Sequence, residues 1–329
     1  EHNAGVGAGF SDQEYELAGA RVVYTPHEVF GRADLLLKVA RPIYEELEWL
    51  RPGTTIMGLL HLSSSRLDKI KVLQDKEITA IPYEQITLAD GTVPVRKPLS
   101  QIGGRLVAQI SAHLLQNDAQ GKGLLLGGIA GVPPAEVVII GGGVFGTYAT
   151  RAFMGIGAHV TVLDTNYESL IKINDDMPNV VTMISNPINV KKVTANADVV
   201  VGGILVPNER TPIVMTREMV RAMRPHSLIM DVSIDEGGCI ETSRPTSHEH
   251  STYIEEGVIH YCVPNIPSIV ARTSTFAFLN AAYPFIQEIA EKGSDQAIAD
   301  NPAIERGAAI IRGNIRHLPR LKPIGAEGE

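Results

Sequence analysis

Short blocks of apolar residues alternate with helix-patterned segments along the chain, most regularly between residues 136 and 267. The apolar blocks there predict six strands, at 136–140, 159–163, 180–184, 198–201, 227–231 and 258–262, with helices between them. Strands that alternate with helices indicate parallel βαβ units rather than a sandwich. This part of the chain therefore predicts a parallel α/β sheet.

Residues 11–93 show the same alternation less regularly. Ser11 is followed three residues later by Glu14, which is the signature of a capping box and predicts the start of a helix. Strands are predicted at 21–24, 34–39, 55–62 and 78–82, and a helix is predicted to end near Asp75. A second α/β region is therefore expected here.

Two longer segments, 100–116 and 273–291, carry apolar residues at helical spacing, and Pro284 predicts that the second helix is kinked or broken. A glycine-rich stretch at 121–131 predicts a boundary loop. One long helix precedes the central block and one follows it, so we expect the chain to leave one domain, build a second and return. We place the first part of one domain at 1–94, the second domain at 95–272, and the connecting helix and return to the first domain at 273–329.

Composition excludes several classes of protein. The 329 residues are 44% hydrophobic and 20% charged, which is typical of globular chains and excludes disordered and collagenous proteins. The length suggests two domains at about 150 residues each. A net charge of −8, without a basic run interleaved with aromatic residues, argues against a nucleic-acid partner. The most apolar stretch, 124–149, contains Glu136, prolines and many glycines, so we expect no membrane span.

The cysteines and the N-terminal segment give expectations about the cellular compartment of the protein. Cys239 and Cys262 lack Cys-x-x-Cys spacing, which favours two small core residues in a reducing compartment and argues against a metal site. No signal peptide opens the chain, so we expect a soluble, cytoplasmic protein. Residue 1 is Glu rather than Met, and we expect the N-terminus to be incomplete.

A glycine motif follows the first strand of the central block. Gly141-Gly-Gly143-Val144-Phe145-Gly146 is Gly-x-Gly-x-x-Gly, between a buried strand and a predicted helix at 147–155. The three glycines permit a tight turn, a close approach of the backbone to a pyrophosphate, and packing of the helix on the strand. The N–H groups and the dipole of the helix N-terminus favour phosphate. The motif predicts a dinucleotide site.

The second strand ends at Asp164, eighteen residues past Gly146. A carboxylate there binds both hydroxyls of the adenine ribose and repels a 2′-phosphate, so it favours NAD over NADP. Flavin and adenosylmethionine remain alternatives, as does a glycine-rich loop without a ligand.

Open parallel sheets bind ligands beyond the carboxyl ends of their strands. By that rule Ile204 and Leu205, after Gly202-Gly203, flank the cofactor, and the next two strands deliver 232–235 and Asn265 to the same edge. Asp235 either caps a loop or accepts a proton. His61 follows the apolar run 55–60, and is either a buried structural histidine or a group that polarises a carbonyl and transfers a proton.

Three cations have two interpretations each. Lys38 lies within an apolar run, where a lysine either extends its amino group to solvent or serves a site. Arg244 and Arg272 are suited to bind phosphate or carboxylate, although a surface role is the default for each. The residue patterns alone leave these alternatives open.

Several further segments have distinctive sequences. They are Leu205-Val-Pro, Asp231-Val-Ser-Ile-Asp-Glu-Gly-Gly-Cys239, Val263-Pro-Asn-Ile-Pro267 and Arg272-Thr-Ser-Thr275, with Leu60-His61-Leu62, Tyr83-Glu84, Ser100 and the segment 5–12. Together they closely resemble the alanine dehydrogenase branch of the alanine dehydrogenase/transhydrogenase family. The resemblance covers nearly the whole chain and is most specific in 231–241 and 263–275.

The resemblance implies a fold and an activity. The fold is α/β, with a Rossmann-type doubly wound parallel sheet that binds NAD and a second, discontinuous α/β substrate domain joined to it by long helices. The activity is the reversible, NAD-dependent oxidative deamination of L-alanine to pyruvate and ammonia by a homo-oligomer, a hexamer or a dimer. Alternatives are a homologue that binds NAD(H) without alanine turnover, as a structural or regulatory subunit, and a dehydrogenase for a different small substrate.

The resemblance also assigns site residues. His61 matches the catalytic histidine of the family and Asp235 its catalytic aspartate. We expect substrate contacts from His61, Asn265 and Lys38. The expected cofactor contacts are Ser100, Gly141, Gly143, Val144, Phe145, Gly146, Asp164, Ser185, Ile204, Leu205, Ile234, Arg244, Val263, Asn265 and Ile266.

This chain departs from the family pattern on the substrate side. Where the family reads Lys-Val-Lys-Glu-Pro, this chain reads Lys38-Val39-Ala40-Arg41-Pro42, so the lysine that holds the substrate carboxylate is replaced by Ala40. The family also carries an arginine for that carboxylate in an N-terminal strand–helix–strand unit, and we expect this chain to begin after that unit. Each charge-assisted contact to a carboxylate contributes about 1.5–3 kcal/mol, so both losses weaken the binding of alanine.

Overall fold

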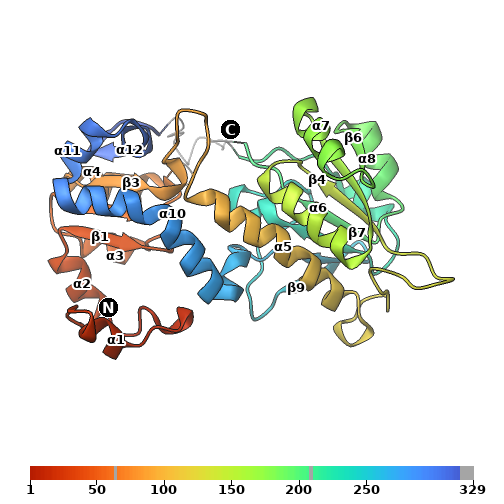
Figure 1. Cartoon of the computed structure of the whole chain (residues 1–329), viewed down its shortest axis with the longest axis horizontal. Coiled ribbons are helices and arrows are strands. Elements are labelled where there is room, and N and C mark those ends of the chain that lie inside the picture. Colours follow the sequence, from red (N-terminus) through yellow and green to blue (C-terminus); the bar gives the residue numbers. More distant parts are fainter. Residues whose placement is uncertain (63–64, 207–209, 319–329) are drawn as a thin grey trace, which may run out of the picture. The chain divides into compact units, whose positions relative to one another are not determined.

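The computed structural model describes residues 1–62, 65–206 and 210–318. The chain forms two compact units (Figure 1), a central unit of 100–269 and a split unit of 1–99 and 270–329. The sequence analysis places domain limits at 94/95 and 272/273, and these stay a prediction. Residues 319–329 of its third segment lie outside the described residues.

The central unit contains a seven-stranded sheet in the order β6-β5-β4-β7-β8-β10-β9. Its strands are β4 (Glu136–Ile140), β5 (His159–Asp164), β6 (Val181–Ile184), β7 (Val199–Gly202), β8 (Leu228–Asp231), β9 (Thr252–Glu255) and β10 (Val258–Tyr261). All neighbours pair in parallel except β9, which pairs antiparallel with β10. The six predicted strands are confirmed to within one or two residues, whereas β9 was not predicted.

Helices cover both faces of this sheet. They are α5 (Arg96–Leu114), α6 (Val144–Ile156), α7 (Tyr167–Asp176), α8 (Pro187–Thr194) and α9 (Arg217–Arg221). Val138 and Ile140 of β4 pack with residues of α8 and α9, whereas Ile139 lies on the face where Gly146 of α6 packs. Both faces of the parallel sheet are therefore buried, and the predicted doubly wound α/β fold is confirmed.

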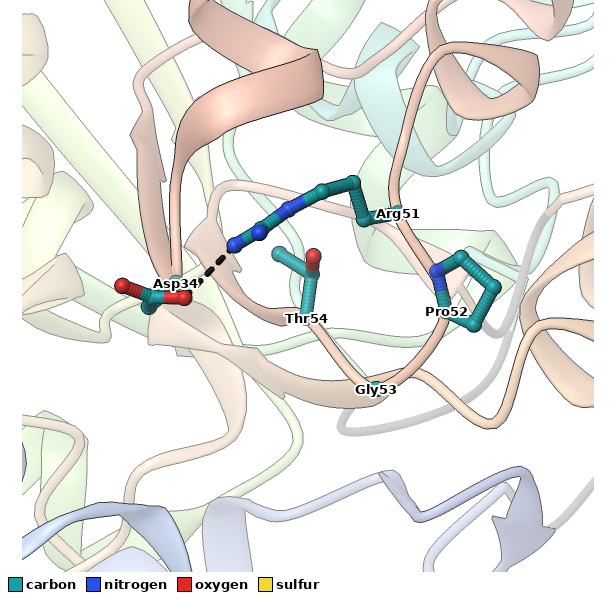
Figure 2. A pocket seen from close by; sticks show the side chains of 5 residues that line it. All are labelled: Asp34, Arg51, Pro52, Gly53 and Thr54. Carbon is teal, nitrogen blue, oxygen red and sulfur yellow. Dashed lines mark hydrogen bonds and ion pairs between the residues drawn. The ribbon is translucent and has the colours of Figure 1, made fainter.

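The split unit contains a five-stranded sheet in the order β1-β2-β3-β11-β12. Its strands are β1 (Leu35–Lys38), β2 (Thr55–Gly58), β3 (Thr79–Pro82), β11 (Ile310–Ile311) and β12 (Asn314–Ile315), of which the first three are parallel. A pocket lies where β1 and β2 begin, and there Arg51 forms an ion pair with Asp34 at 2.6 Å (Figure 2). This is the amino edge of the parallel strands.

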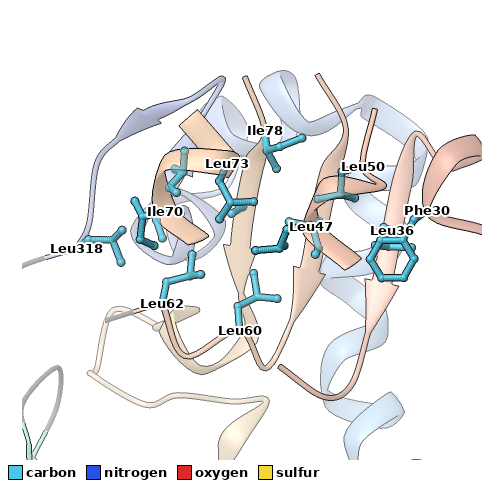
Figure 3. Packing of buried hydrophobic residues seen from close by; sticks show 14 residues of the cluster. Phe30, Leu36, Leu47, Leu50, Leu60, Leu62, Ile70, Leu73, Ile78 and Leu318 are labelled. Atoms are coloured by element: carbon cyan, nitrogen blue, oxygen red, sulfur yellow. The ribbon is translucent and has the colours of Figure 1, made fainter. Parts of the chain in front are cut away.

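Two apolar clusters enclose the split-unit sheet. Ile56 of β2 belongs to one cluster, with Leu47, Ile70 and Leu73 (Figure 3), and the adjacent Met57 belongs to the other. The alternation follows from the two-residue period of a strand. The surrounding helices are α1 (Asp12–Leu17), α2 (Pro26–Arg32), α3 (Tyr44–Glu48), α4 (Leu67–Asp75), α10 (Ala271–Lys292), α11 (Ser294–Asp300) and α12 (Pro302–Gly307). The capping box of Ser11 and Glu14 is confirmed at α1.

One prediction for the split unit is wrong, and another is wrong in part. Residues 21–24 form no strand, because they join neither sheet: the Val23 carbonyl accepts a hydrogen bond from the His2 N–H, and Tyr24 is exposed. Of the predicted kink or break at Pro284, the break does not occur, since α10 runs through this residue, and the kink stays a prediction. Pro284 and Asn280, whose carbonyl loses its helical partner to the proline, are both exposed, so solvent satisfies that carbonyl.

Candidate functional site

The glycine loop joins β4 to α6, and its three motif glycines have different surroundings. A Cβ on Gly146 would lie 1.8 Å from the Gly141 carbonyl oxygen, so only glycine lets α6 pack there. Gly141 has a φ of 110°, and a Cβ on it would lie 2.5 Å from the Gly203 carbonyl oxygen. A Cβ on Gly143 would meet no described atom within 4 Å. The loop is tight at both ends and open in the middle.

The open middle coincides with the N-terminus of a thirteen-residue helix. Gly143 is the N-cap of α6, and no side chain caps that turn. The first N–H groups of α6 and its positive dipole end are therefore available to an anion. The residues present fit the pyrophosphate of a dinucleotide.

Asp164 ends β5 next to this loop. Its two carboxylate oxygens accept hydrogen bonds from the N–H of Gly142 at 2.6 Å and of Asn166 at 2.7 Å. These bonds fix the carboxylate, and each oxygen keeps a further lone pair for a ribose hydroxyl. Its backbone carbonyl accepts from the N–H of Ser185 at 2.9 Å, which brings that predicted residue to the same edge.

Phe145 fills the space between the loop and the end of β7. A Cβ on Gly203 would lie 2.4 Å from the Phe145 ring, and one on Gly103 of α5 would lie 3.4 Å from it. The side chain of Phe145 therefore packs between these glycines and is half-buried. Past β7, Ile204 donates its N–H to the Ser233 hydroxyl at 2.9 Å, and the side chain of Leu205 is exposed.

A buried carboxylate organises the turn after β8. Asp231 is 1% exposed and accepts hydrogen bonds from the N–H groups of Ser233, Cys239 and Ile240 at 2.9–3.1 Å. Burial raises the pKa of Asp231, and the hydrogen bonds from its neighbours oppose that rise. Burial also raises the pKa of the Cys239 thiol, in keeping with the core role predicted for it. The sequence analysis assigned no role to Asp231, although its position before Gly237-Gly238 is the signal for such a turn.

This turn places Asp235 beside Asn265. Asp235 lies in the 3-10 turn Val232–Glu236, and its Oδ2 accepts a hydrogen bond from the Asn265 N–H at 3.2 Å. Two predicted site residues, from the ends of neighbouring strands β8 and β10, thus meet at the carboxyl edge of the sheet. The side chains of Ile234, Val263 and Ile266 are buried, so only their backbone groups are available for the predicted cofactor contacts.

Two remaining predicted residues of the central unit lie apart from this contact. Ser100 is half-buried on α5. Arg244 is exposed, and its guanidinium lies 4.1 Å from the centre of the Tyr253 ring.

In the split unit, His61 follows β2 with a φ of 46°. Its backbone N–H donates to Oε1 of Glu84 at 2.5 Å, and its carbonyl accepts from the Ser65 hydroxyl at 3.1 Å. These bonds fix a left-handed backbone that a histidine rarely adopts.

Glu84 is a residue to which the sequence analysis assigned no role. Burial raises the pKa of its carboxyl group, while the charges of His61 and Arg96 act in the opposite direction. Its Oε2 is buried and has no hydrogen-bond partner among the described residues. A buried carboxyl with one oxygen unsatisfied is costly, and such groups concentrate at functional sites.

Lys38 is engaged within the split unit. Its amino group forms an ion pair with Glu46 at 2.8 Å and lies 5.7 Å from the centre of the Phe30 ring. Ala40 lies just past β1 and is exposed, so a longer side chain has room there. The pocket of Figure 2, lined by Asp34, Arg51 and Thr54, lies at the opposite strand edge from His61 and includes none of the predicted site residues.

No helix among the described residues has the length and apolar composition to cross a membrane. No group of three or more His, Cys, Asp or Glu side chains in the same part of the chain is placed to hold a metal ion.

Comparisons with known proteins give consistent results. The family model "Alanine dehydrogenase/PNT, N-terminal domain" matches residues 1–103, and "Alanine dehydrogenase/PNT, C-terminal domain" matches residues 107–318. An alanine dehydrogenase from Methanococcus maripaludis is 44% identical over 96% of this chain and 85% of its own length. One from Bacillus subtilis is 40% identical over 99% of this chain and 86% of its own length. A solved L-alanine dehydrogenase structure has a TM-score of 0.88 and 37% identity, over 96% of this chain and 87% of its own.

Proposed function

Because the chain belongs to the alanine dehydrogenase/PNT family, we propose that it catalyses the NAD-dependent oxidative deamination of L-alanine to pyruvate and ammonia, in either direction. The observation that carries this proposal is the turn held by Asp231, which sets Asp235 against Asn265 on the same sheet edge as the glycine loop. A proton-transferring group and a dinucleotide loop on one edge are what a dehydrogenase needs.

The cofactor-binding groups of the proposal are mainly backbone groups. The N-terminus of α6 and the open face of Gly143 receive the pyrophosphate, and Asp164 receives the ribose hydroxyls. Bound NAD supplies the acceptor for the hydride that leaves the substrate carbon. The carboxylate of Asp164 repels a 2′-phosphate, which supports NAD rather than NADP.

Asp235 and His61 are the proposed proton-transferring groups. In the direction of deamination, water must lose a proton to add to the substrate carbon, and Asp235 is suited to accept and pass on that proton. His61 is suited to donate a hydrogen bond to the carbonyl oxygen of pyruvate and to exchange a proton with it near neutral pH. Glu84 is a positioning residue, because it fixes the backbone of His61.

The proposal assigns only one cation to the substrate carboxylate. Asn265 is the proposed polar contact in the central unit, and Lys38 is the proposed cation of the split unit. Lys38 has to exchange its ion pair with Glu46 for one with the substrate. Since Ala40 stands where the family carries a lysine, we expect a high KM for L-alanine.

The assembly and the location are further parts of the proposal. We expect a homo-oligomer, a hexamer or a dimer, located in the cytoplasm. The two buried, free cysteines support a reducing compartment. Light scattering coupled to gel filtration measures the assembly, and a monomer at micromolar concentration contradicts that part.

The test is a spectrophotometric assay of the purified chain. NAD and L-alanine at alkaline pH are expected to produce NADH absorbance, and pyruvate, ammonium and NADH are expected to consume it. NADP in place of NAD, D-alanine in place of L-alanine, and the Asp235→Asn variant are the controls, and each is expected to give little signal. NADH binding without turnover in either direction overturns the proposed activity in favour of a binding protein. Turnover of another small substrate, with none of alanine, overturns the substrate.

A further inference from the structure

Three side chains of the central unit form a stack on the β9–β10 hairpin. The ring of Tyr253, from β9, lies on that of His260, from β10, with centres 4.9 Å apart and planes 17° apart. The guanidinium of Arg244 lies 4.1 Å from the centre of the Tyr253 ring. Tyr253 and His260 are directly paired across the hairpin, so the strand register itself creates the stack.

The ring of His260, on which Tyr253 lies, is held in place by hydrogen bonds. It is 0% exposed, and both ring nitrogens are engaged: Nδ1 with the Val258 carbonyl at 2.9 Å and Nε2 with the Thr242 hydroxyl at 2.8 Å. A carbonyl only accepts, so Nδ1 donates and Nε2 accepts from Thr242. Burial lowers the pKa of His260, which keeps the ring neutral. A neutral ring with two occupied nitrogens neither rotates nor repels a cation stacked above it.

Tyr253 is held at its hydroxyl as well as at its face. The hydroxyl donates to the Thr242 carbonyl at 2.8 Å and accepts from the Arg244 N–H at 2.9 Å. The same tyrosine therefore fixes both the backbone and the guanidinium of Arg244. A cation over an aromatic face is a favourable arrangement.

Arg244 is an exposed cation with an ordered side chain and, among the described residues, no carboxylate in ion-pair contact. The contrast is Arg217 of α9, which pairs with two carboxylates of the same hairpin, Glu255 at 2.7 Å and Glu256 at 2.9 Å. An unrestrained arginine loses considerable side-chain entropy on binding, and prior ordering reduces that loss. Arg244 is thus ordered in advance while its donors remain available to a ligand.

The position of Arg244 identifies the ligand. Thr246 exchanges two hydrogen bonds with Cys262 just past the end of β10, at 3.0 and 3.3 Å. A Cβ on Gly238 would lie 3.5 Å from that of Ser243, so the segment also contacts the turn that carries Asp235. Arg244 therefore belongs to the carboxyl edge of the sheet, where ligands of such sheets bind.

We infer that Tyr253, seated on His260, is a positioning residue that presents the guanidinium of Arg244 to an oxygen of the bound dinucleotide. The inference rests on the proposed function only in taking NAD(H) as that ligand. Tyr253 touches neither substrate nor cofactor in this account, and it acts through Arg244 alone.

The test is a double-mutant cycle read by NADH fluorescence titration. Tyr253→Leu is expected to raise the Kd for NADH about fivefold, and Arg244→Gln about tenfold. The double variant is expected to match Arg244→Gln, because Tyr253 has nothing left to position. Tyr253→Phe keeps the ring and is expected to stay within about twofold of wild type. Arg217→Gln, which removes an arginine of α9 that is paired with carboxylates of the same hairpin, is the charge control and is expected to leave the Kd unchanged.

Several outcomes overturn the inference: an unchanged Kd in Tyr253→Leu, effects in the double variant that multiply, or an equal loss in Arg217→Gln. If Tyr253→Leu does not fold, Arg244→Lys keeps the charge without the planar stack, and a wild-type Kd in that variant also overturns it. If the wild-type protein binds NADH but does not turn over alanine, the proposed activity is wrong. The double-mutant cycle still tests the role of Tyr253 in that case. Absence of NADH binding by the wild type overturns both.

Discussion

The central unit offers a ligand mainly backbone groups, whereas the split unit offers side chains that already bind one another. In the central unit the open face of Gly143 and the uncapped N-terminus of α6 form the proposed dinucleotide site. In the split unit the His61 backbone is bound to Glu84, and Lys38 is bound to Glu46. The two kinds of site respond to different perturbations.

A backbone site depends on space. It does not tolerate an added atom, since N–H groups must approach the phosphate closely. A site of paired side chains depends on ionisation and on each partner, because a buried carboxyl is stable only with its hydrogen bonds. Substitutions that add atoms, remove charges or shift pH therefore separate the two units.

The largest effect on turnover is expected from substitution of Asp235, which lies in the turn after β8. Asp235→Asn keeps the shape but cannot accept a proton, so we expect turnover of L-alanine to fall by about 10²–10⁴. The Kd for NADH is expected to stay within about twofold. Asp176→Asn, an exposed carboxylate paired with Arg151 on the same unit, is the control for charge. An equal loss of NADH affinity in Asp235→Asn would show that Asp235 is structural.

The next largest effect, on the Kd for NADH, is expected from an added methyl group in the glycine loop. Gly143→Ala adds a methyl group where no described atom lies within 4 Å, and its φ of −67° suits alanine. The folded chain is therefore expected to be as stable as wild type. The methyl group occupies the path of the pyrophosphate, so the Kd for NADH is expected to rise about tenfold to a hundredfold, measured by fluorescence titration.

Two other glycines of α6 are matched controls. Gly155 also has no described atom within 4 Å of an added Cβ, but it lies at the far end of the helix, so Gly155→Ala is expected to keep NADH affinity and to stabilise the chain by up to about 1 kcal/mol. Gly146→Ala places a Cβ 1.8 Å from the Gly141 oxygen and is expected to lower the thermal midpoint. Normal NADH binding by Gly143→Ala would contradict the assigned site.

A smaller gain is expected from restoring a charge in the split unit. Ala40→Lys adds the cation that the family carries at this position, and a charge-assisted contact to the substrate carboxylate is expected to raise kcat/KM for L-alanine about tenfold, chiefly through KM. The position is exposed, so the fold is expected to accept the lysine. Val39→Lys, which adds the same charge at the adjacent exposed position, is the control. An unchanged rate in Ala40→Lys would count against the assigned alignment.

The contrast between the units also explains what the sequence predicts well. The strands of the central unit and its glycine loop follow from local patterns, because each βαβ unit is nearly contiguous in sequence. The segment 21–24 has the composition of a strand but no neighbour to pair with, and β9 exists because β10 provides a partner. Strand pairing is a tertiary property that the local pattern does not contain.

The same limit applies to the site. Asp235, Asn265 and the glycines could be placed because they follow strand ends, and their direct contact with cofactor or substrate stays a prediction. The roles of Glu84 and Asp231 could not be predicted, because each depends on hydrogen bonds to residues at other positions in the fold. A buried carboxylate that holds a backbone has no sequence signal of its own beyond the neighbouring glycines.

The smallest effect is expected in the pH dependence of stability. The folded chain holds the Glu84 proton more tightly than the unfolded chain, because burial raises its pKa above 4.5. Wild-type stability therefore falls as the pH rises from about 4.5 through the folded pKa. Glu84→Gln cannot titrate, so its free energy of unfolding relative to wild type is expected to rise with pH over that window and then level off.

Urea unfolding of both proteins at a series of pH values measures this difference in the free energy of unfolding. Any loss of stability at low pH that both proteins share cancels in the difference. The amide oxygen of the glutamine still accepts from the His61 N–H, so the variant is expected to fold. A difference that falls as the pH rises would mean that His61 and Arg96 outweigh burial and that Glu84 is charged throughout. In that case the split unit would hold a buried ion cluster, and the positioning of His61 would depend on charge rather than on a neutral hydrogen bond.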